Sequence, residues 1–191
     1  MSKTLLITNL LSNTLENDDD SSGLKNNFKK ITEIFLNFDM RYKMTCRVCG
    51  ESGTQKGLLF HCDKINCGSV HWNKSKVLKL RKEIELDDVL RSEILHEAGV
   101  PILDNNNNHH FVYILRLRGQ LRSRYVGLTG LHPFERYFNH IRGYRASRIA
   151  KKKATALVSF EGPMSYIKAQ IREPELAEIL RLEGFDVHGG H

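Results

Sequence analysis

Four cysteines, all between residues 46 and 67, have the spacing of a metal site. Cys46 and Cys49 form a Cys-x2-Cys pair, and twelve residues further on Cys62 begins a second pair with Cys67. Each pair can bend around one face of an ion, and four thiolates that converge in this way bind zinc tetrahedrally. A closed site of this kind leaves no open coordination position, so we expect a structural Zn²⁺ ion.

The second cysteine pair leaves the ligand set open. Four residues separate Cys62 from Cys67, and two histidines, His61 and His71, lie close by. Because imidazole is also a common zinc ligand, either histidine can replace Cys62 or Cys67. The segment resembles a zinc ribbon or a short zinc finger, against which Trp72 is expected to pack.

Positive charge is concentrated between residues 116 and 153. The chain has 29 Lys+Arg against 22 Asp+Glu, a net charge of +7. Within this stretch, eleven basic residues stand against a single acid, Glu135. A field of this sign favours a polyanion, and nucleic acid is the commonest one. The charge therefore predicts a nucleic-acid partner.

The elements that must position these residues fall into two modules. We expect a flexible tail over 1–23, a helical and zinc-binding module over 24–102, a polar linker over 103–110 and a second domain over 111–191. Apolar spacing predicts helices over 24–36, 75–84 and 86–98 in the first module. In the second, it predicts strands at 111–117 and 124–129, a helix over 133–147, a strand at 154–160 and a helix over 172–185. This order is typical of an α+β fold.

The second domain resembles the GIY-YIG nuclease family over about two fifths of the chain, residues 110–191. The likeness consists of Phe111-Val112-Tyr113, then Tyr125-Val126-Gly127, then Arg136, His140 and a late acidic helix. Phe111 and Val112 replace the glycine and isoleucine of the family name. Membership would imply a small three-stranded antiparallel sheet flanked by helices. Gly127 is expected where the backbone approaches another segment closely.

The resemblance assigns roles to the matching residues. Tyr113 corresponds to a general base or water-orienting group, which requires surroundings that lower its pKa from about 10. Arg136 corresponds to the arginine that grips the scissile phosphate, a task suited to its planar donors. Tyr125 and His140 correspond to supporting positions around the phosphate. His140 follows Arg136 by one helical turn, so both side chains can face one site.

The family also uses one carboxylate of the last helix to hold a divalent cation. Glu175 is the preferred candidate, because Ile179 and Leu182 follow it at the family's apolar spacing. Glu178 is the nearest rival, and Glu173 is a more distant one. Oxygen ligands with water in the remaining positions suit Mg²⁺.

The resulting hypothesis is a metal-dependent, sequence-specific DNA endonuclease of the type II restriction-like kind that acts on double-stranded DNA. The alternatives are a homing or repair-type nuclease and a non-catalytic, zinc-containing nucleic-acid-binding protein. Cutting both strands of a palindrome would call for a homodimer on DNA. No apolar run approaches the roughly 18 residues of a membrane span, and the first residues lack a secretory signal. We therefore expect a cytoplasmic protein without a membrane partner.

Overall fold

The computed structural model describes residues 45–103 and 109–190, which belong to one compact unit, residues 43–191. The expected tail over 1–23 and the expected helix over 24–36 lie outside the described residues. Residues 104–108, most of the expected linker, lie outside them as well.

The described chain is α+β, as expected, but the sheet is larger than the three strands predicted. One seven-stranded mixed sheet has the order β1 (Gly53–Lys56), β2 (Leu59–Cys62), β3 (Val70–Trp72), β6 (Ala154–Met164), β4 (His110–Leu117), β5 (Ser123–Thr129), β7 (Asp186–Gly189). The expected three strands form its centre. On one side β3 pairs with β6 at Val70 and Leu157, and on the other β7 pairs in parallel with β5. The prediction of a small three-stranded sheet is therefore wrong.

Six helices accompany this sheet in the described ranges: α3 (Lys74–Lys79), α4 (Arg81–Leu86), α5 (Asp88–Glu97), α6 (Pro133–Arg142), α7 (Arg148–Lys153) and α8 (Tyr166–Leu182). Helix α6 is shorter than predicted because Gly143 ends it in a left-handed conformation, with φ of 84°. Helix α8 begins six residues before the predicted start at 172, where Ser165 caps it by accepting from the Lys168 amide. Pro174 therefore lies inside the helix and does not mark its start.

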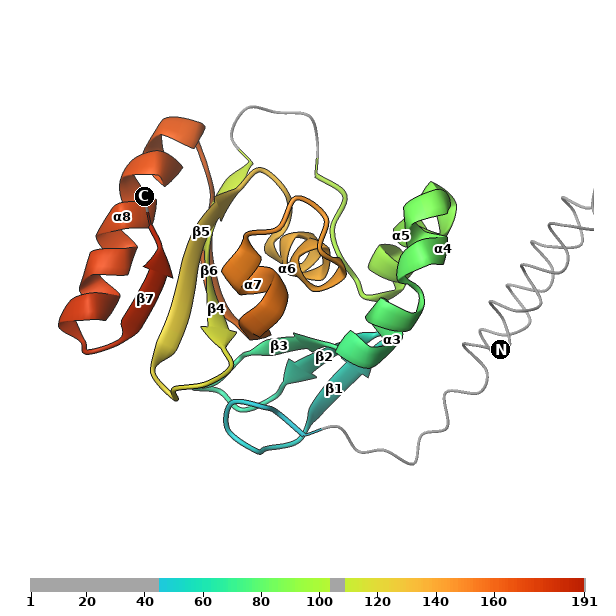
Figure 1. Ribbon diagram of the computed structural model, residues 1–191, viewed down its shortest axis with the longest axis horizontal. Helices are drawn as coiled ribbons and strands as arrows, with labels where there is room; N and C mark the ends of the chain where they lie inside the picture. Colours follow the sequence, from blue (N-terminus) through green and yellow to red (C-terminus); the bar gives the residue numbers. More distant parts are fainter. Residues whose placement is uncertain (1–44, 104–108, 191) are drawn as a thin grey trace, which may run out of the picture. The chain divides into compact units, whose positions relative to one another are not determined.

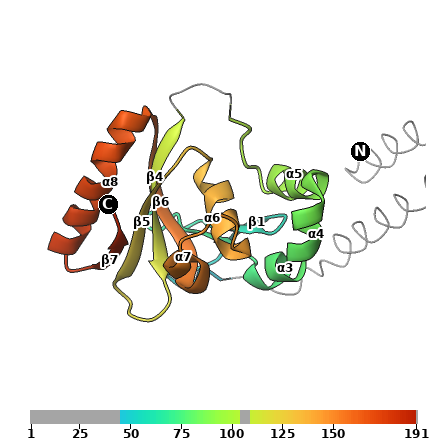
Figure 2. The same cartoon turned by 45° about the horizontal axis from the view of Figure 1, so that its top comes forward.

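Helices cover both faces of the central strands. Figures 1 and 2 show α8 against one face of β4, β5 and β6, and α6 and α7 against the other. The α8 face is an apolar cluster that contains Val112, Ile114 and Val126 from the strands and Leu176 and Leu180 from the helix. Side chains alternate along a strand, so the odd-numbered residues of β4 and β5 point toward α6. This alternation places both motif tyrosines on the α6 face.

Candidate functional site

The β4–β5 hairpin fixes the first tyrosine. Tyr113 lies directly opposite Gly127 in the antiparallel register. A Cβ atom on residue 127 would lie 2.7 Å from the Tyr113 hydroxyl oxygen and 2.9 Å from a ring carbon of Tyr125. Only glycine leaves room for the Tyr113 side chain to cross this position, which is the close approach expected from the sequence.

Three motif side chains converge on the α6 face of the sheet. The Tyr113 hydroxyl lies 2.7 Å from His140 Nε2, and both residues are fully buried. The Tyr125 ring is 6.2 Å from the Tyr113 ring and 5.7 Å from the His140 ring, and its side chain is only partly buried. These three residues come from β4, β5 and α6, so the packing of α6 on the hairpin assembles the cluster.

Arg136 joins this cluster from the preceding turn of α6. Its Nη1 donates to the Arg145 carbonyl oxygen at 3.0 Å. Its buried Nε has no hydrogen-bond partner among residues 45–103 and 109–190. The positive charge lowers the pKa of His140 and opposes the rise in the pKa of Tyr113. Tyr113, Tyr125, Arg136 and His140 are hereafter called the Tyr113 cluster.

Burial decides the ionisation of the central pair. It raises the pKa of Tyr113 well above the usual value, and the effect of Tyr125 adds to it, while Arg136 acts in the opposite direction. Burial and then the charge of Arg136 lower the pKa of His140 to about 3. Near neutral pH both side chains are therefore uncharged, and the phenol can donate to Nε2. The lowered phenol pKa that a tyrosine base requires is not found in this state.

The candidate carboxylates lie on α8, on the other side of the sheet. Glu175 is exposed, and its Oε2 is 3.4 Å from Arg172 Nη1. Arg172 also forms a two-point ion pair with Glu161 of β6, at 2.7 and 2.9 Å. Glu178 pairs with Arg181 at 3.2 Å. Within the described ranges, no hydrogen bond or ion pair joins Glu175 to the Tyr113 cluster.

Glu173, the most distant sequence candidate, lies beside the C-terminal strand. Its backbone carbonyl oxygen is 3.6 Å from the position that a Cβ would take on Gly190. Gly190 directly follows β7, the strand that pairs with the Tyr125 strand. The backbone at Glu173 therefore lies near the segment that directly follows β7.

The C-terminal strand adds two polar residues that the sequence analysis did not single out. His188 is the parallel neighbour of Tyr125 in β7, so the two side chains share a face of the sheet. Asp186 Oδ2 is 3.4 Å from His188 Nε2 and 3.1 Å from the Ser123 hydroxyl, which donates to it. The alternation of Asp186 and His188 in front of two glycines was the only signal for this strand, and it spans just four residues.

The four cysteines form a compact cluster of thiols. All four are free, and their Sγ atoms lie within 4.8 Å of one another. Two Sγ pairs, Cys46 with Cys67 and Cys49 with Cys62, are separated by 3.7 and 3.5 Å. Tetrahedral zinc with bonds of about 2.3 Å requires sulfur atoms about 3.8 Å apart. The described cluster can therefore hold a metal ion such as zinc.

The nearby histidines lie outside the thiol cluster. His71 Nε2 is 3.3 Å from Cys46 Sγ, and its Nδ1 is 3.2 Å from the Thr155 carbonyl oxygen of β6. The His61 ring packs against Phe134 with centroids 5.3 Å apart. Burial favours the Cys46 thiol, but hydrogen bonds from Ser69, the backbone and His71 outweigh it and lower the pKa of Cys46 to about 5. His71 is thus placed to hydrogen-bond a ligating sulfur.

Trp72 connects the cysteine module, residues 45–72 with the four cysteines and strands β1 to β3, to α6. Its ring lies 4.9 Å from the Phe138 ring, and its Nε1 donates to the Phe134 carbonyl oxygen at 3.0 Å. The residue is fully buried, so it packs between the two parts of the fold.

Comparison with known proteins found no relative of this chain. No family model, curated protein or solved structure matched the chain. The likeness to GIY-YIG nucleases therefore rests on the sequence motifs quoted above. Across residues 45–103 and 109–190, every helix is too short or too polar to cross a membrane.

Proposed function

We propose that the chain is a divalent-cation-dependent DNA endonuclease of the GIY-YIG type. The observation that carries this proposal is the convergence of the Tyr113 cluster, in which four residues of the motif order meet at one face of the sheet. A merely structural set of strand aromatics does not require a buried tyrosine–histidine hydrogen bond next to an arginine. The excess of basic residues between 116 and 153 supports a substrate with many phosphates.

Arg136 is the proposed phosphate ligand. A guanidinium offers planar donors that match phosphate oxygens and keeps its charge at all physiological pH values. Its buried Nε lacks a protein acceptor in the described ranges, and an unpaired buried donor is costly. A phosphate oxygen would supply the missing acceptor. The positive charge of Arg136 would then lie next to the phosphate, on which negative charge develops during cleavage.

Tyr113 and His140 are proposed to act as one unit. The phenol remains protonated and donates to His140 Nε2, which fixes the orientation of the neutral imidazole ring. In this proposal His140, with its Nε2 lone pair occupied and its pKa lowered to about 3, supports the site and is not the general base. Tyr125, which is more exposed than Tyr113 and His140, would contact the substrate.

Magnesium dependence is proposed from the resemblance alone, with Glu175 as the ligand. The ion pair of Glu175 with Arg172, on the α8 side of the sheet, does not fit a cation site at the Tyr113 cluster. The proposal also includes structural Zn²⁺ in the cysteine cluster, a restriction-like specificity, a homodimer on DNA and a cytoplasmic location.

The test is cleavage of several unmethylated plasmids by the zinc-loaded protein with Mg²⁺. Discrete bands are expected for a sequence-specific nuclease, and a smear would indicate a nonspecific one. Arg136→Ala should abolish cleavage, whereas Arg81→Ala, which removes a half-buried cation of α4 that is paired with Glu85, should not. Duplex binding without cleavage under any divalent metal would instead support the non-catalytic nucleic-acid-binding alternative.

The carboxylate is identified by three parallel substitutions. The resemblance implies that Glu175→Gln abolishes cleavage while Glu178→Gln retains it, whereas the place of Glu175 on the α8 side of the sheet predicts that Glu175→Gln still cleaves. Glu173→Gln is measured beside them because of its place next to β7. If only Glu173→Gln abolishes cleavage, the assignment of Glu175 is wrong while the nuclease proposal stands.

A further inference from the structure

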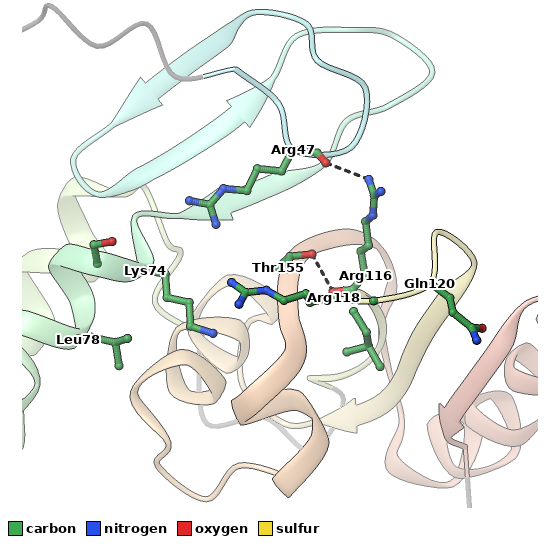
Figure 3. A pocket seen from close by; sticks show the side chains of 10 residues that line it. Arg47, Lys74, Leu78, Arg116, Arg118, Gln120 and Thr155 are labelled. Carbon is green, nitrogen blue, oxygen red and sulfur yellow. Dashed lines mark hydrogen bonds between the residues drawn. The ribbon is translucent and has the colours of Figure 1, made fainter.

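A second basic site lies away from the Tyr113 cluster. A cavity of about 620 Å³ opens between the cysteine module, α3 and the β4–β5 hairpin, as Figure 3 shows. Its walls carry four cationic side chains: Arg47, Lys74, Arg116 and Arg118. All of its described lining residues are neutral or basic, with Gln120 and Thr155 among the polar ones.

These cations are not neutralised by the protein. None of the four forms an ion pair with a carboxylate in the part of the chain that the structure describes. Figure 3 shows Lys74 and Arg118 directed toward one another. Burial, and then the charges of Arg118 and Arg47, lower the pKa of Lys74, so the side chains repel one another. An anion in the cavity would relieve this repulsion.

The walls of the cavity are held in place by hydrogen bonds between modules. Arg116 Nη1 donates to the carbonyl oxygens of Arg47 and Val48, at 2.9 and 3.3 Å. The Thr155 hydroxyl donates to the Arg116 carbonyl oxygen at 3.2 Å. The backbone that carries the cations is thus fixed before any ligand binds, which lowers the entropic cost of binding.

We propose that this cavity binds a phosphate group of the DNA backbone, at a position separate from the phosphate to be cut. Arg116 follows Tyr113 by three residues on β4, so its side chain leaves the strand on the opposite face and reaches the carbonyl oxygens of Arg47 and Val48. Because phosphate contacts set the register of a protein on a duplex, the cavity fixes where the DNA lies relative to the Tyr113 cluster. The proposal rests on the proposed function, since it takes duplex DNA as the ligand.

The experiment measures duplex binding by fluorescence anisotropy, with the zinc-loaded full chain and with magnesium omitted. The double substitution Lys74→Ala and Arg118→Ala is compared with Lys82→Ala and Lys168→Ala, which removes the same charge at two exposed positions outside the cavity. Between about 50 and 200 mM salt, the cavity variant is expected to lower the slope of log affinity against log salt by about 0.9 for each lost phosphate contact. Its affinity at low salt should fall by about tenfold or more.

Two controls separate charge from folding. The exchange Lys74→Arg with Arg118→Lys keeps both charges and should retain the wild-type slope. Zinc content and thermal unfolding of every variant must match the wild type. A cavity variant that binds with the slope and affinity of the charge-matched control overturns the proposal. Tight inorganic phosphate binding that is lost in the cavity variant, with duplex binding unchanged, also overturns it, because the cavity is then a small-anion site.

Cleavage by the same samples with Mg²⁺ distinguishes the two proposals. If the wild type does not cut but the cavity variant loses salt-dependent binding, the nuclease function fails and the phosphate site stands. If the wild type cuts and the cavity variant binds and cuts like its control, the phosphate site fails and the nuclease function stands.

Discussion

The Tyr113 hydroxyl lies 2.7 Å from His140 Nε2 in a region closed to solvent. Tyr113 lies on β4 and His140 lies on α6, and the packing of α6 onto the β4–β5 hairpin brings the two side chains together. A buried polar group without a partner is costly, so each of the two side chains depends on the other. This dependence makes the pair accessible to experiments on both activity and stability.

Replacement of Tyr113 by phenylalanine should affect both properties. The change removes the donor to His140 Nε2, and we expect the free energy of unfolding to fall by about 1–3 kcal/mol. Cleavage of plasmid DNA should fall by about a hundredfold or more, because the imidazole loses its fixed orientation. The matched control is Tyr144→Phe, at an exposed tyrosine, which should leave both properties close to wild type. Unchanged cleavage by Tyr113→Phe would remove Tyr113 from the site.

The lowered pKa of His140 predicts a pH-dependent stability. The unfolded histidine titrates near 6.5 and the folded one near 3, so between these values the unfolded state binds more protons. The contribution of His140 to stability should therefore be constant above about pH 6.5 and fall as the pH decreases toward 3, by at most about 1.4 kcal/mol per pH unit. His140→Gln should reduce this slope in urea titrations, while His96→Gln, at an exposed histidine, should not. His61 and His132, whose pKa values are also lowered by burial, account for a residual slope in both variants.

Gly127→Ala tests the crossing of Tyr113 over β5. A methyl group at 2.7 Å from the hydroxyl oxygen and 2.8 Å from the adjoining ring carbon must displace the tyrosine. We expect destabilisation of about 1–3 kcal/mol in denaturant unfolding and a loss of cleavage. Gly130→Ala is the control, because its nearest neighbour, His110 Nε2, is at an ordinary 3.4 Å. Equal stability of the two variants would contradict the close approach.

Metal analysis tests the cysteine cluster. The purified protein should contain a single zinc ion by mass spectrometry of the metal content, and Cys46→Ala or Cys67→Ala should lose it. The free energy of unfolding should fall by several kcal/mol with the metal. His71→Gln should keep the zinc, since His71 contacts the Cys46 sulfur from outside the thiol cluster. Loss of zinc in this variant alone would make His71 a ligand.

The central strands and the motif residues could be predicted from the sequence because their signals are local. The predicted strands at 111–117 and 124–129 are rich in β-branched and aromatic side chains, and they lie within β4 and β5. The position of Gly127 could also be understood, because glycine inside a strand often marks a close approach. The hydrogen bond of Tyr113 was not predictable, since it depends on where α6 packs.

The outer strands and the acidic helix depend on tertiary contacts. Strands β3 and β7 contain three and four residues, too few for a periodic pattern to stand out. Pro174 suggested a helix start, but the Ser165 cap adds two turns ahead of it, which fixes the face on which Glu175 lies. The sequence does not reveal which face of the sheet α8 covers. It therefore does not reveal that Glu175 lies on the side of the sheet opposite the Tyr113 cluster.

The pairing of β3 with β6 gives the cysteine cluster an influence on solubility. Val70 and Leu157 join a strand of the cysteine module to the longest strand of the sheet. If the thiols were oxidised or held no metal, β3 would loosen and the edge of β6 around Leu157 would lose its partner strand. Unpaired edges of this kind pair with other chains and promote aggregation. Metal supply and thiol redox state would then govern how much protein stays dispersed in the cell, in addition to how well it folds.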